Sequence, residues 1–209
     1  ANTKIPFSEH DSVNHPLSIY AASKKSNELM AHSYSYLYQL PTTGLRFFTV
    51  YGPWGRPDMA PMIFTKAILE NKPIKIFNNG HMSRDFTFID DVIEILKQLI
   101  NKPAFPDNNF SRKSPNPSTS WSPYRIFNIG NNNSLSLMSF INFLEEELNI
   151  KAIKRYVPMQ QGDVEETFAD TLSIEEYTGY KPNTNFKKGI RIFVNWYKEF
   201  YDIKFLGLK

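Results

Sequence analysis

Hydrophobic and polar positions follow two periods along this chain, and the two periods alternate. Apolar residues three and four apart predict helices, and short apolar or alternating runs predict strands. The alternation of the two indicates an α/β architecture. The expected helices span residues 16–39, 58–70, 90–99, 136–149, 171–178 and 187–201. The expected strands span residues 42–50, 74–77, 84–89, 124–129 and 151–157.

Helix start and stop signals support several of these boundaries. Pro16 opens the first helix and Pro41 ends it, while Asp90 and Ser136 are expected to act as N-caps. Gly179 is a C-terminal stop for the helix that precedes it. The last helix is expected to bury one apolar stripe, formed by Ile190, Phe193, Val194 and Tyr197.

Two segments lack a helix or strand pattern. Residues 78–80, with two asparagines and a glycine, predict a turn. Residues 101–123 are rich in proline, serine and asparagine. Because ordered patterns resume on both sides, we expect a long exposed loop there and not a domain linker.

Composition and charge narrow the class of protein. A chain of 209 residues, 41% of them hydrophobic, can bury one sizeable core or one domain with part of another. A net charge of +3, with no basic run longer than two residues, gives no indication of a nucleic-acid partner. No apolar run approaches the ~18 residues of a membrane span, and no signal peptide is recognised, so we expect a cytoplasmic location.

Metal and disulfide chemistry receive little support. The chain has no cysteine, which excludes disulfides and thiolate metal sites. The four histidines, His10, His15, His32 and His81, show no paired ligand spacing with carboxylates. We therefore expect surface or packing roles for them.

Tyr20 and Lys24 are the first candidates for catalysis. They are four residues apart in the first expected helix, and residues with this spacing share one helix face. A cation about 5 Å from a phenol stabilises the phenolate by on the order of 3 kcal/mol at an effective dielectric constant of ~20. The pair is therefore suited to proton abstraction, although the spacing alone also fits an ordinary aromatic residue beside a solvated lysine.

Five segments in order along the chain carry a resemblance to a known family. They are PLSIYAASK at 16–24, LRFFTVYGPWGRPDM at 45–59, RDFTFIDDV at 84–92, YRIFNIGN at 124–131 and QGDV at 161–164. Together they resemble the extended short-chain dehydrogenase/reductases, and within them the nucleotide-sugar epimerases. The greatest similarity is to the UDP-glucuronate 4-epimerase group, which includes capsule-synthesis epimerases.

The resemblance implies a fold and a division of the chain. We expect the C-terminal part of a Rossmann-like parallel sheet plus a smaller α/β substrate-binding region. Residues 1–53 and 85–130 would form the remainder of the Rossmann core, and residues 54–84 and 131–209 mainly the substrate-binding region. The resemblance also implies NAD as cofactor, a UDP-sugar as substrate, and a homodimer built on the helix of Tyr20.

One family feature is not found in the sequence. Members carry a Gly-x-x-Gly-x-x-Gly turn whose amide groups hold the dinucleotide pyrophosphate, and none of the 9 glycines here follows that spacing. The serine or threonine that completes the catalytic set is not recognised either. We therefore expect this chain to correspond to the C-terminal two-thirds of the enzyme, with half the active site and without tight NAD binding of its own.

The resemblance assigns the catalytic roles. Tyr20 would take the proton of the sugar 4-hydroxyl while hydride passes from C4 to NAD+, and return of the hydride to the other face of the 4-keto sugar would invert C4. Lys24 would favour the phenolate and hydrogen-bond the nicotinamide ribose. Phe47 and Phe48 would line the nicotinamide site.

The same resemblance implies a substrate-binding set. Thr49 fits contact with a sugar carboxylate, and Arg56 and Arg84 offer bidentate, permanently charged hydrogen bonds to a diphosphate or carboxylate. Taken singly, each arginine would also fit a surface ion pair, and Asp163 would fit a turn. The remaining contacts are Phe77 and Asn78 with the uracil and Asp163 with the ribose.

Three interpretations stay open at this point. The first is a UDP-glucuronate/UDP-galacturonate 4-epimerase that serves capsule or surface polysaccharide synthesis. The second is a sister enzyme, such as another nucleotide-sugar epimerase, a dehydratase or a decarboxylase. The third is a catalytically incomplete fragment that binds a nucleotide sugar or dimerises. Asp85, Asp90 and Asp91 could be mistaken for a metal-binding cluster. Helix capping explains Asp90 without a metal, so these residues do not change the choice among the three interpretations.

Overall fold

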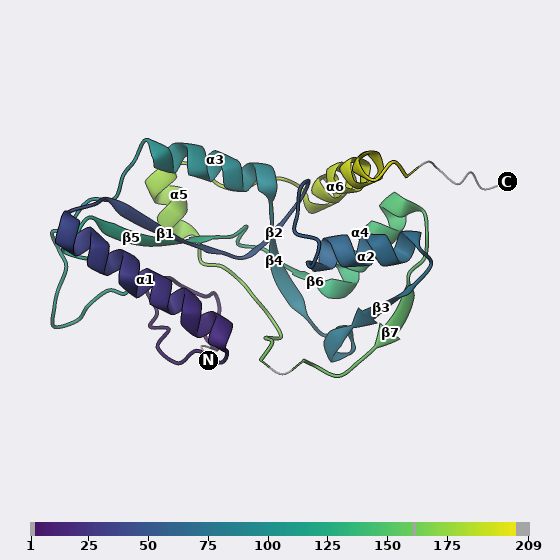
Figure 1. The fold of residues 1–209 in the computed structure, drawn as a ribbon, viewed down its shortest axis with the longest axis horizontal. Coiled ribbons are helices and arrows are strands. Elements are labelled where there is room, and N and C mark those ends of the chain that lie inside the picture. Colours follow the sequence, from purple (N-terminus) through teal and green to yellow (C-terminus); the bar gives the residue numbers. More distant parts are fainter. Residues whose placement is uncertain (1–2, 161, 204–209) are drawn as a thin grey trace.

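The computed structural model describes residues 3–160 and 162–203, whose helices and strands form two regions (Figure 1). The first region contains strands β1 and β5 with helices α1, α3 and α5, and the second contains α2, α4 and α6 with strands β3 and β7. Strands β2, β4 and β6 lie between them. This confirms the expected α/β class.

The elements have the following bounds. The helices are α1 (Ile19–Tyr38), α2 (Ala60–Leu69), α3 (Ile89–Ile100), α4 (Leu137–Leu148), α5 (Leu172–Thr178) and α6 (Phe186–Phe200), with a 3-10 turn at Phe77–Gly80. The strands are β1 (Thr42–Phe47), β2 (Thr49–Tyr51), β3 (Pro73–Ile76), β4 (Ser83–Phe88), β5 (Tyr124–Ile129), β6 (Ser134–Ser136) and β7 (Ile153–Tyr156).

The first region is built on a parallel strand pair. β1 and β5 are in register from Thr42 opposite Tyr124 to Phe47 opposite Ile129. Helix α1 covers one face of this pair, and α3 and α5 cover the other (Figure 1). The small core on that second face consists of Val92, Ile95, Phe127, Ile129 and Ile174.

Helix α1 has well-defined ends but little buried surface. The Ser18 hydroxyl accepts a hydrogen bond from the Ala21 amide at 3.1 Å, which caps the first turn. Gln39 ends the helix in the left-handed conformation, with φ of 50°. Of the side chains in this helix, Ser35 is the buried one.

The expected strand 42–50 is two strands in the structure. The Phe48 amide still donates to the Ile129 carbonyl at 2.9 Å, but Thr49 to Tyr51 pair with Phe86 to Phe88 of β4. The chain therefore leaves the first sheet at Phe48 and joins a second one. The apolar pattern continues through the switch, which is why the sequence did not reveal it.

The second region has the larger core. Helices α2, α4 and α6 pack around Phe86, Phe140 and Phe193, while β4 pairs antiparallel with β6 and β3 pairs parallel with β7. Alternate residues of β3, Ile74 and Ile76, point into this core. The expected apolar stripe of α6 is confirmed, because all four residues named for it are buried.

Two local expectations were wrong. Asp90 is not the N-cap of α3: Phe88 occupies that position, and Asp90 and Asp91 lie in the first turn, where the helix dipole still favours carboxylates. Residues 101–123 contain no helix or long strand, but they are not exposed throughout. Ser118, Ser120 and Ser122 are buried, since this end of the loop packs back on the molecule.

The expected start of the first helix at Pro16 was also wrong, because Ser18 caps it and α1 begins at Ile19. Two other boundaries agree with the sequence. Ser136 caps α4 through the Ser139 amide at 3.0 Å, and Gly179 ends α5 with φ of 76°. Strand β6 was not expected because its three residues merge with that cap. Within residues 3–160 and 162–203, no helix combines the length and apolar character that crossing a bilayer requires.

Candidate active site

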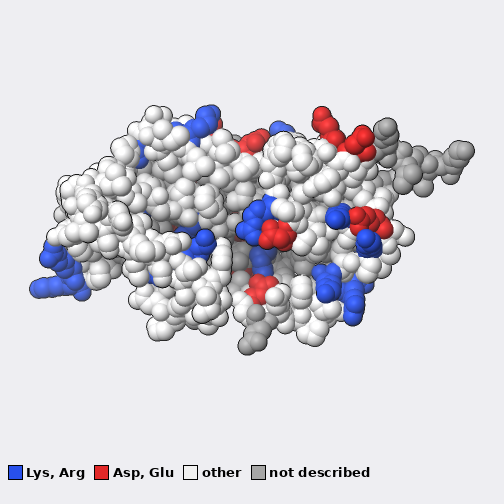
Figure 2. All heavy atoms as spheres, in the orientation of Figure 1, with Lys and Arg blue, Asp and Glu red and all other residues white. Residues whose placement is uncertain are grey.

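An open cavity of about 830 Å³ lies where the two regions meet. Figure 2 shows acidic and basic side chains gathered around a hollow at this place. Its walls come from α1, the switch between β1 and β2, the loop after β2, and β4. Seven of the ten residues named from the sequence line it: Tyr20, Phe47, Phe48, Thr49, Arg56, Arg84 and Asp163.

The position of this cavity follows from the strand topology. Phe47 ends β1, and Phe48 and Thr49 lie at the point where the chain changes sheets. In α/β sheets, ligands bind outside the carboxyl ends of the parallel strands. The residues where the chain changes sheets therefore lie at the cavity, as the end of β1 predicts.

Tyr20 and Lys24 lie together, as the helix spacing predicts. The Lys24 ammonium is 5.3 Å from the centroid of the Tyr20 ring, and the Tyr20 side chain is 68% exposed. A second cavity of about 440 Å³ lies beside the first, and Lys24 lines it. Tyr20 and Phe48 line both cavities, so the phenol lies at their boundary.

The loop after β2 is fixed by a glycine and a tryptophan. Gly52 has φ of 137°, and a Cβ there would lie 2.5 Å from the Ile89 side chain, so only glycine fits. Trp54 is in the left-handed region with φ of 62°, and its ring packs against Trp196 at 5.6 Å and Phe200 at 5.0 Å between centroids. This anchor on α6 holds the loop at the rim of the cavity.

Arg56 follows on that loop and pairs with Asp58. Its Nη2 and Nε atoms donate to the two carboxylate oxygens at 2.5 and 3.1 Å. The hydrogen bonds and charge of Asp58, together with the nearby Tyr20, raise the pKa of Arg56 further. Both side chains are more than 60% exposed, so the guanidinium can exchange this partner for a ligand at little cost.

Arg84 and Asp163 bind each other across the cavity wall. Arg84 Nη2 donates to Asp163 Oδ1 at 2.8 Å, and Nη1 donates to the carbonyls of Ser83 and Glu165 at 2.9 and 3.1 Å. The sequence predicted that each residue contacts a ligand, but it did not predict that the two residues bind each other. The pair ties β4 to the segment that carries Asp163.

The residue after Arg84 is a buried carboxylate, Asp85. Asp85 accepts hydrogen bonds from the amides of Asn131 at 2.8 Å and Ala169 at 3.0 Å. Burial raises the pKa of Asp85, and these amide hydrogen bonds oppose the rise. Asp85 thus joins β4 to two loops and holds the wall of the cavity in place.

Phe77 and Asn78 do not line either cavity. Asn78 is in the left-handed conformation, with φ of 48°, and its amide group donates to the His81 carbonyl at 2.8 Å. This explains the expected turn at 78–80. The assignment of both residues to the uracil stays a prediction.

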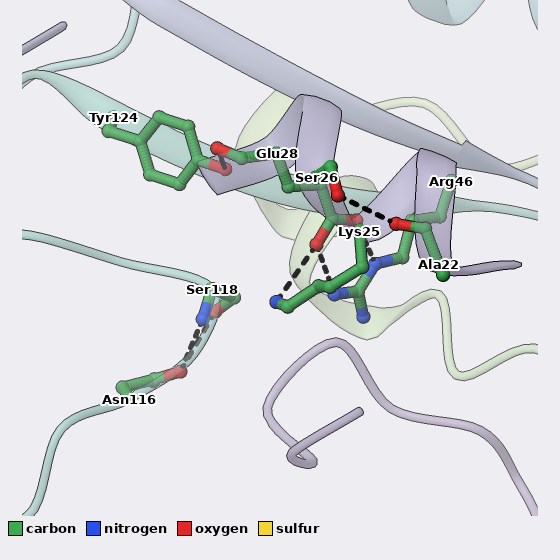
Figure 3. Close-up of polar contacts among 8 residues, drawn as sticks. All are labelled: Ala22, Lys25, Ser26, Glu28, Arg46, Asn116, Ser118 and Tyr124. Atoms are coloured by element: carbon green, nitrogen blue, oxygen red, sulfur yellow. Dashed lines mark hydrogen bonds and ion pairs between the residues drawn. The ribbon is translucent and has the colours of Figure 1, made fainter. Parts of the chain in front are cut away.

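An ion-pair network next to Lys24 was missed in the sequence. Glu28 of α1 accepts hydrogen bonds from Arg46 of β1 at 2.7 and 3.0 Å and from Lys25 at 3.1 Å (Figure 3). Two features of the sequence could have indicated this network. Glu28 is four residues after Lys24 on the same expected helix, and Arg46 is a charged residue within an apolar strand.

His32 has a packing role. Its Nε2 lies 2.7 Å from the Ser120 hydroxyl, and Trp121 and Tyr124 pack edge-on against its ring. Burial lowers the pKa of this imidazole. Among residues 3–160 and 162–203, no three His, Asp or Glu side chains are grouped as a metal site would require.

The chemistry around Tyr20 fits one end of a nicotinamide cofactor. Lys24 offers a charged donor for ribose hydroxyls in the smaller cavity, Phe47 offers a ring in the larger one, and Phe48 lines both. An amide cradle for a pyrophosphate would require the glycine-rich turn that the sequence does not contain. The residues present therefore fit the nicotinamide and its ribose.

Comparison with protein families identifies the family of this chain. The model for the NAD dependent epimerase/dehydratase family matches residues 1–130. The chain belongs to this family.

Individual relatives cover nearly all of the chain. It is 52% identical over 201 residues to Protein CapI of Staphylococcus aureus and 46% identical over 202 residues to a probable UDP-glucuronate 4-epimerase of Rhizobium meliloti (strain 1021). Each alignment covers 96% of this chain, which spans 60% and 59% of the length of the two relatives.

A solved structure shows the same fold. The UDP-glucuronic acid 4-epimerase of Bacillus cereus, in complex with UDP-glucuronic acid and NAD, matches 96% of this chain and 60% of its own chain. The TM-score is 0.75 at 28% identity. The expected Rossmann-like partial fold is therefore confirmed.

Proposed function

We propose that this chain provides the substrate side of an NAD-dependent 4-epimerase that interconverts UDP-glucuronate and UDP-galacturonate. The observation that carries the proposal is a single cavity that Tyr20, Thr49, Arg56 and Arg84 all line. One proton acceptor and two cations thus face the same space. A UDP-sugar uronate carries a hydroxyl to be deprotonated together with negative charges to be bound.

Tyr20 is the proposed base. Its exposed phenol lies at the boundary of the two cavities, where it can contact a sugar hydroxyl on one side and a cofactor on the other. Lys24, whose ammonium is 5.3 Å from the centroid of the Tyr20 ring, supplies a positive charge beside this proposed base. NAD, when bound, supplies the hydride acceptor and donor at C4.

Thr49 and the two arginines are the proposed substrate contacts. Thr49 can donate its hydroxyl to the sugar carboxylate, and Arg56 can leave the exposed Asp58 to bind a carboxylate or a diphosphate oxygen. Arg84 is held more firmly, by two carbonyls and Asp163. We propose that Arg84 binds the diphosphate, and that Asp163 reaches the ribose, with Phe77 and Asn78 near the uracil.

The direct test is turnover. The protein is incubated with NAD+ and UDP-glucuronate, and the appearance of UDP-galacturonate is followed by chromatography or by the sugar proton resonances. A change at C4 with retention of the carboxylate supports the epimerase. Release of carbon dioxide indicates a decarboxylase, and loss of water indicates a dehydratase.

A binding test isolates the carboxylate contacts. If Thr49 and Arg56 bind the uronate, UDP-glucuronate should bind more tightly than UDP-glucose by calorimetry. Equal affinity for both sugars contradicts that assignment. Binding of both sugars without any turnover supports a nucleotide-sugar-binding chain.

The sequence resemblance suggests a biological setting. The product would be an activated uronate, and we propose that it serves capsule or surface polysaccharide synthesis. Disruption of the gene should remove galacturonate from the surface polysaccharide, as measured by sugar analysis. An unchanged sugar composition contradicts this role and leaves the chemistry intact.

We also propose a homodimer that uses α1. Several large apolar side chains of this helix are at least half exposed, among them Leu29, Met30, Tyr34 and Leu37. An apolar helix face of this kind is suited to pack against a second copy of itself. The molar mass in solution tests this directly.

A further inference from the structure

The carboxylate of Glu28 is held by two cations, and neither is Lys24. Arg46 donates through Nε and Nη2 at 2.7 and 3.0 Å, and Lys25 donates through Nζ at 3.1 Å. Figure 3 shows both cations directed at this carboxylate, while the Tyr124 hydroxyl contacts the Glu28 carbonyl on the other side.

Helix geometry offers Glu28 a different partner. Lys24 and Glu28 are four residues apart on α1, a spacing at which opposite charges commonly pair. Tyr20 is four residues before Lys24 on the same face. Lys24 therefore has two possible partners within one helix turn, and in the structure its ammonium is 5.3 Å from the centroid of the Tyr20 ring.

Arg46 is well placed to decide this competition. Its planar guanidinium binds both carboxylate oxygens, and the side chains of Arg46 and Glu28 are only 21% and 18% exposed. Charge-assisted bidentate pairs are stronger and more directional than a single lysine contact. Arg46 also belongs to β1, which ends one residue later beside the cavity.

We propose that Arg46 is a positioning residue that keeps the Glu28 carboxylate away from Lys24. Lys24 is thereby left available to Tyr20 and to the ribose of the cofactor. The catalytic consequence rests on the proposed function, whereas the competition for Lys24 can be measured without any turnover.

The proposal predicts an unusual relation between two substitutions. Arg46→Met removes the bidentate partner and leaves Glu28 with Lys25, so the carboxylate can also pair with Lys24 and the single variant should be impaired. Adding Glu28→Gln removes the competing carboxylate, so the double variant should recover. A role limited to fastening α1 to β1 predicts the opposite, because the double variant would then be no better than Arg46→Met.

Chemical labelling of Lys24 is the first measurement. The chain is treated with limiting formaldehyde and cyanoborohydride, and the methylation rate of each lysine is read by peptide mass spectrometry. Arg46→Met should slow labelling of Lys24 by about twofold, the factor expected from one ion pair four residues apart on a helix. Glu28→Gln/Arg46→Met should restore the original rate, and Arg46→Lys should retain it.

A matched control is present on α3. Lys97 pairs with Glu94 at 2.7 Å on that helix, and its labelling should be the same in every variant. Thermal unfolding of each variant shows that it is folded. If Arg46→Met does not fold, Arg46→Gln replaces it in both the single and the double variant, because glutamine keeps the polar contact and removes the charge.

Equal labelling of Lys24 in Arg46→Met and the double variant overturns the proposal. Where the protein turns over UDP-glucuronate, Arg46→Met should lower kcat and leave KM for the sugar unchanged, and the double variant should regain kcat. If the labelling pattern is found but the unchanged protein shows no epimerisation, the positioning role stands and the proposed function fails.

Discussion

Helices α1 and α6 are held in place by different forces. The 15 residues of α6 bury five positions, including Ile190, Phe193 and Val194, against the second core. The 20 residues of α1 bury one. Polar contacts hold α1 instead, notably Glu28 with Arg46, the Tyr124 hydroxyl, and His32 with Ser120.

This difference separates stability from chemistry. The second region is stabilised by apolar burial, and its buried side chains can be altered only at a cost in folding free energy. The first region presents Tyr20 and Lys24 on a helix that depends on few buried contacts. Substitutions in the two regions should therefore affect different measurements.

The largest effect is expected for Tyr20→Phe. This change removes the proposed proton acceptor, so epimerisation should slow by about 10³-fold or more, or at least ~4 kcal/mol in the activation free energy. Because the side chain is 68% exposed, the free energy of unfolding should change by less than about 0.5 kcal/mol. Initial rates and urea unfolding measure the two quantities.

Tyr34→Phe is the control for that substitution. Tyr34 lies on the same helix, is 60% exposed and lines neither cavity. Its loss of a hydroxyl should leave the rate unchanged. A rate for Tyr20→Phe within tenfold of the original would exclude Tyr20 as the base.

Phe193→Ala in α6 should act in the opposite way. Phe193 is fully buried in the second core, and removing a buried phenylalanine side chain costs about 3–5 kcal/mol. Urea unfolding should show this loss. Under native conditions, the epimerisation rate per folded molecule should be unchanged, since Phe193 does not line the cavity.

If Phe193→Ala inactivates folded protein, the separation of stability and catalysis between the two regions is wrong. A fluorescence or circular dichroism signal recorded in the same samples determines the folded fraction. Reduced activity in fully folded protein would mean that the second core controls the geometry of the cavity.

Acid should affect the second region through Glu145. Burial raises the pKa of this carboxyl, but hydrogen bonds from Lys151, Lys154 and the Ala152 amide lower it to about 2. The folded-state pKa is below the unfolded value of 4.5, so the stabilisation is present above pH 4.5 and is lost as the pH falls towards 2. Glu145→Gln should remove this part of the pH dependence, on the order of 2 kcal/mol.

Urea unfolding at pH 7 and at pH 3 measures that change. Asp202→Asn, at an exposed turn after α6, should keep the original pH dependence. If Glu145→Gln loses as much stability between the two pH values as the unchanged protein, Glu145 is not the group responsible.

The sequence predicted most helices and strands because their patterns are local. Ser136 and Gly179 set helix ends through their own turns, and Ile190 and Phe193 share a face by helix period alone. The change of partner at Phe48 could not be predicted, because strand pairing depends on residues far away in the chain. The same reason explains why Arg84 and Asp163, both named as ligand contacts, were not recognised as partners of each other.

The candidate site shows the same limit. Tyr20 and Lys24 are related by helix geometry, so their proximity was predictable, whereas Glu28 and Arg46 meet across two elements. Asp90 was misassigned because a carboxylate is favourable both at the N-cap and in the first turn. Local chemistry alone cannot separate those two positions.

The smallest effect on folding is expected for Leu37→Ala on α1. Leu37 is 67% exposed, so its removal should change the unfolding free energy of the monomer by less than about 0.5 kcal/mol. If α1 forms the proposed dimer, the same substitution should weaken association by about 1 kcal/mol or more, because the side chain would then be buried between copies. Sedimentation over a range of concentrations measures association, and urea unfolding of dilute protein measures folding. Lys97→Ala on α3, 63% exposed in its side chain, is the control and should change neither. Loss of about 2 kcal/mol from the dilute protein would show that Leu37 stabilises the fold of a single chain, and the contrast between α1 and α6 would then be wrong.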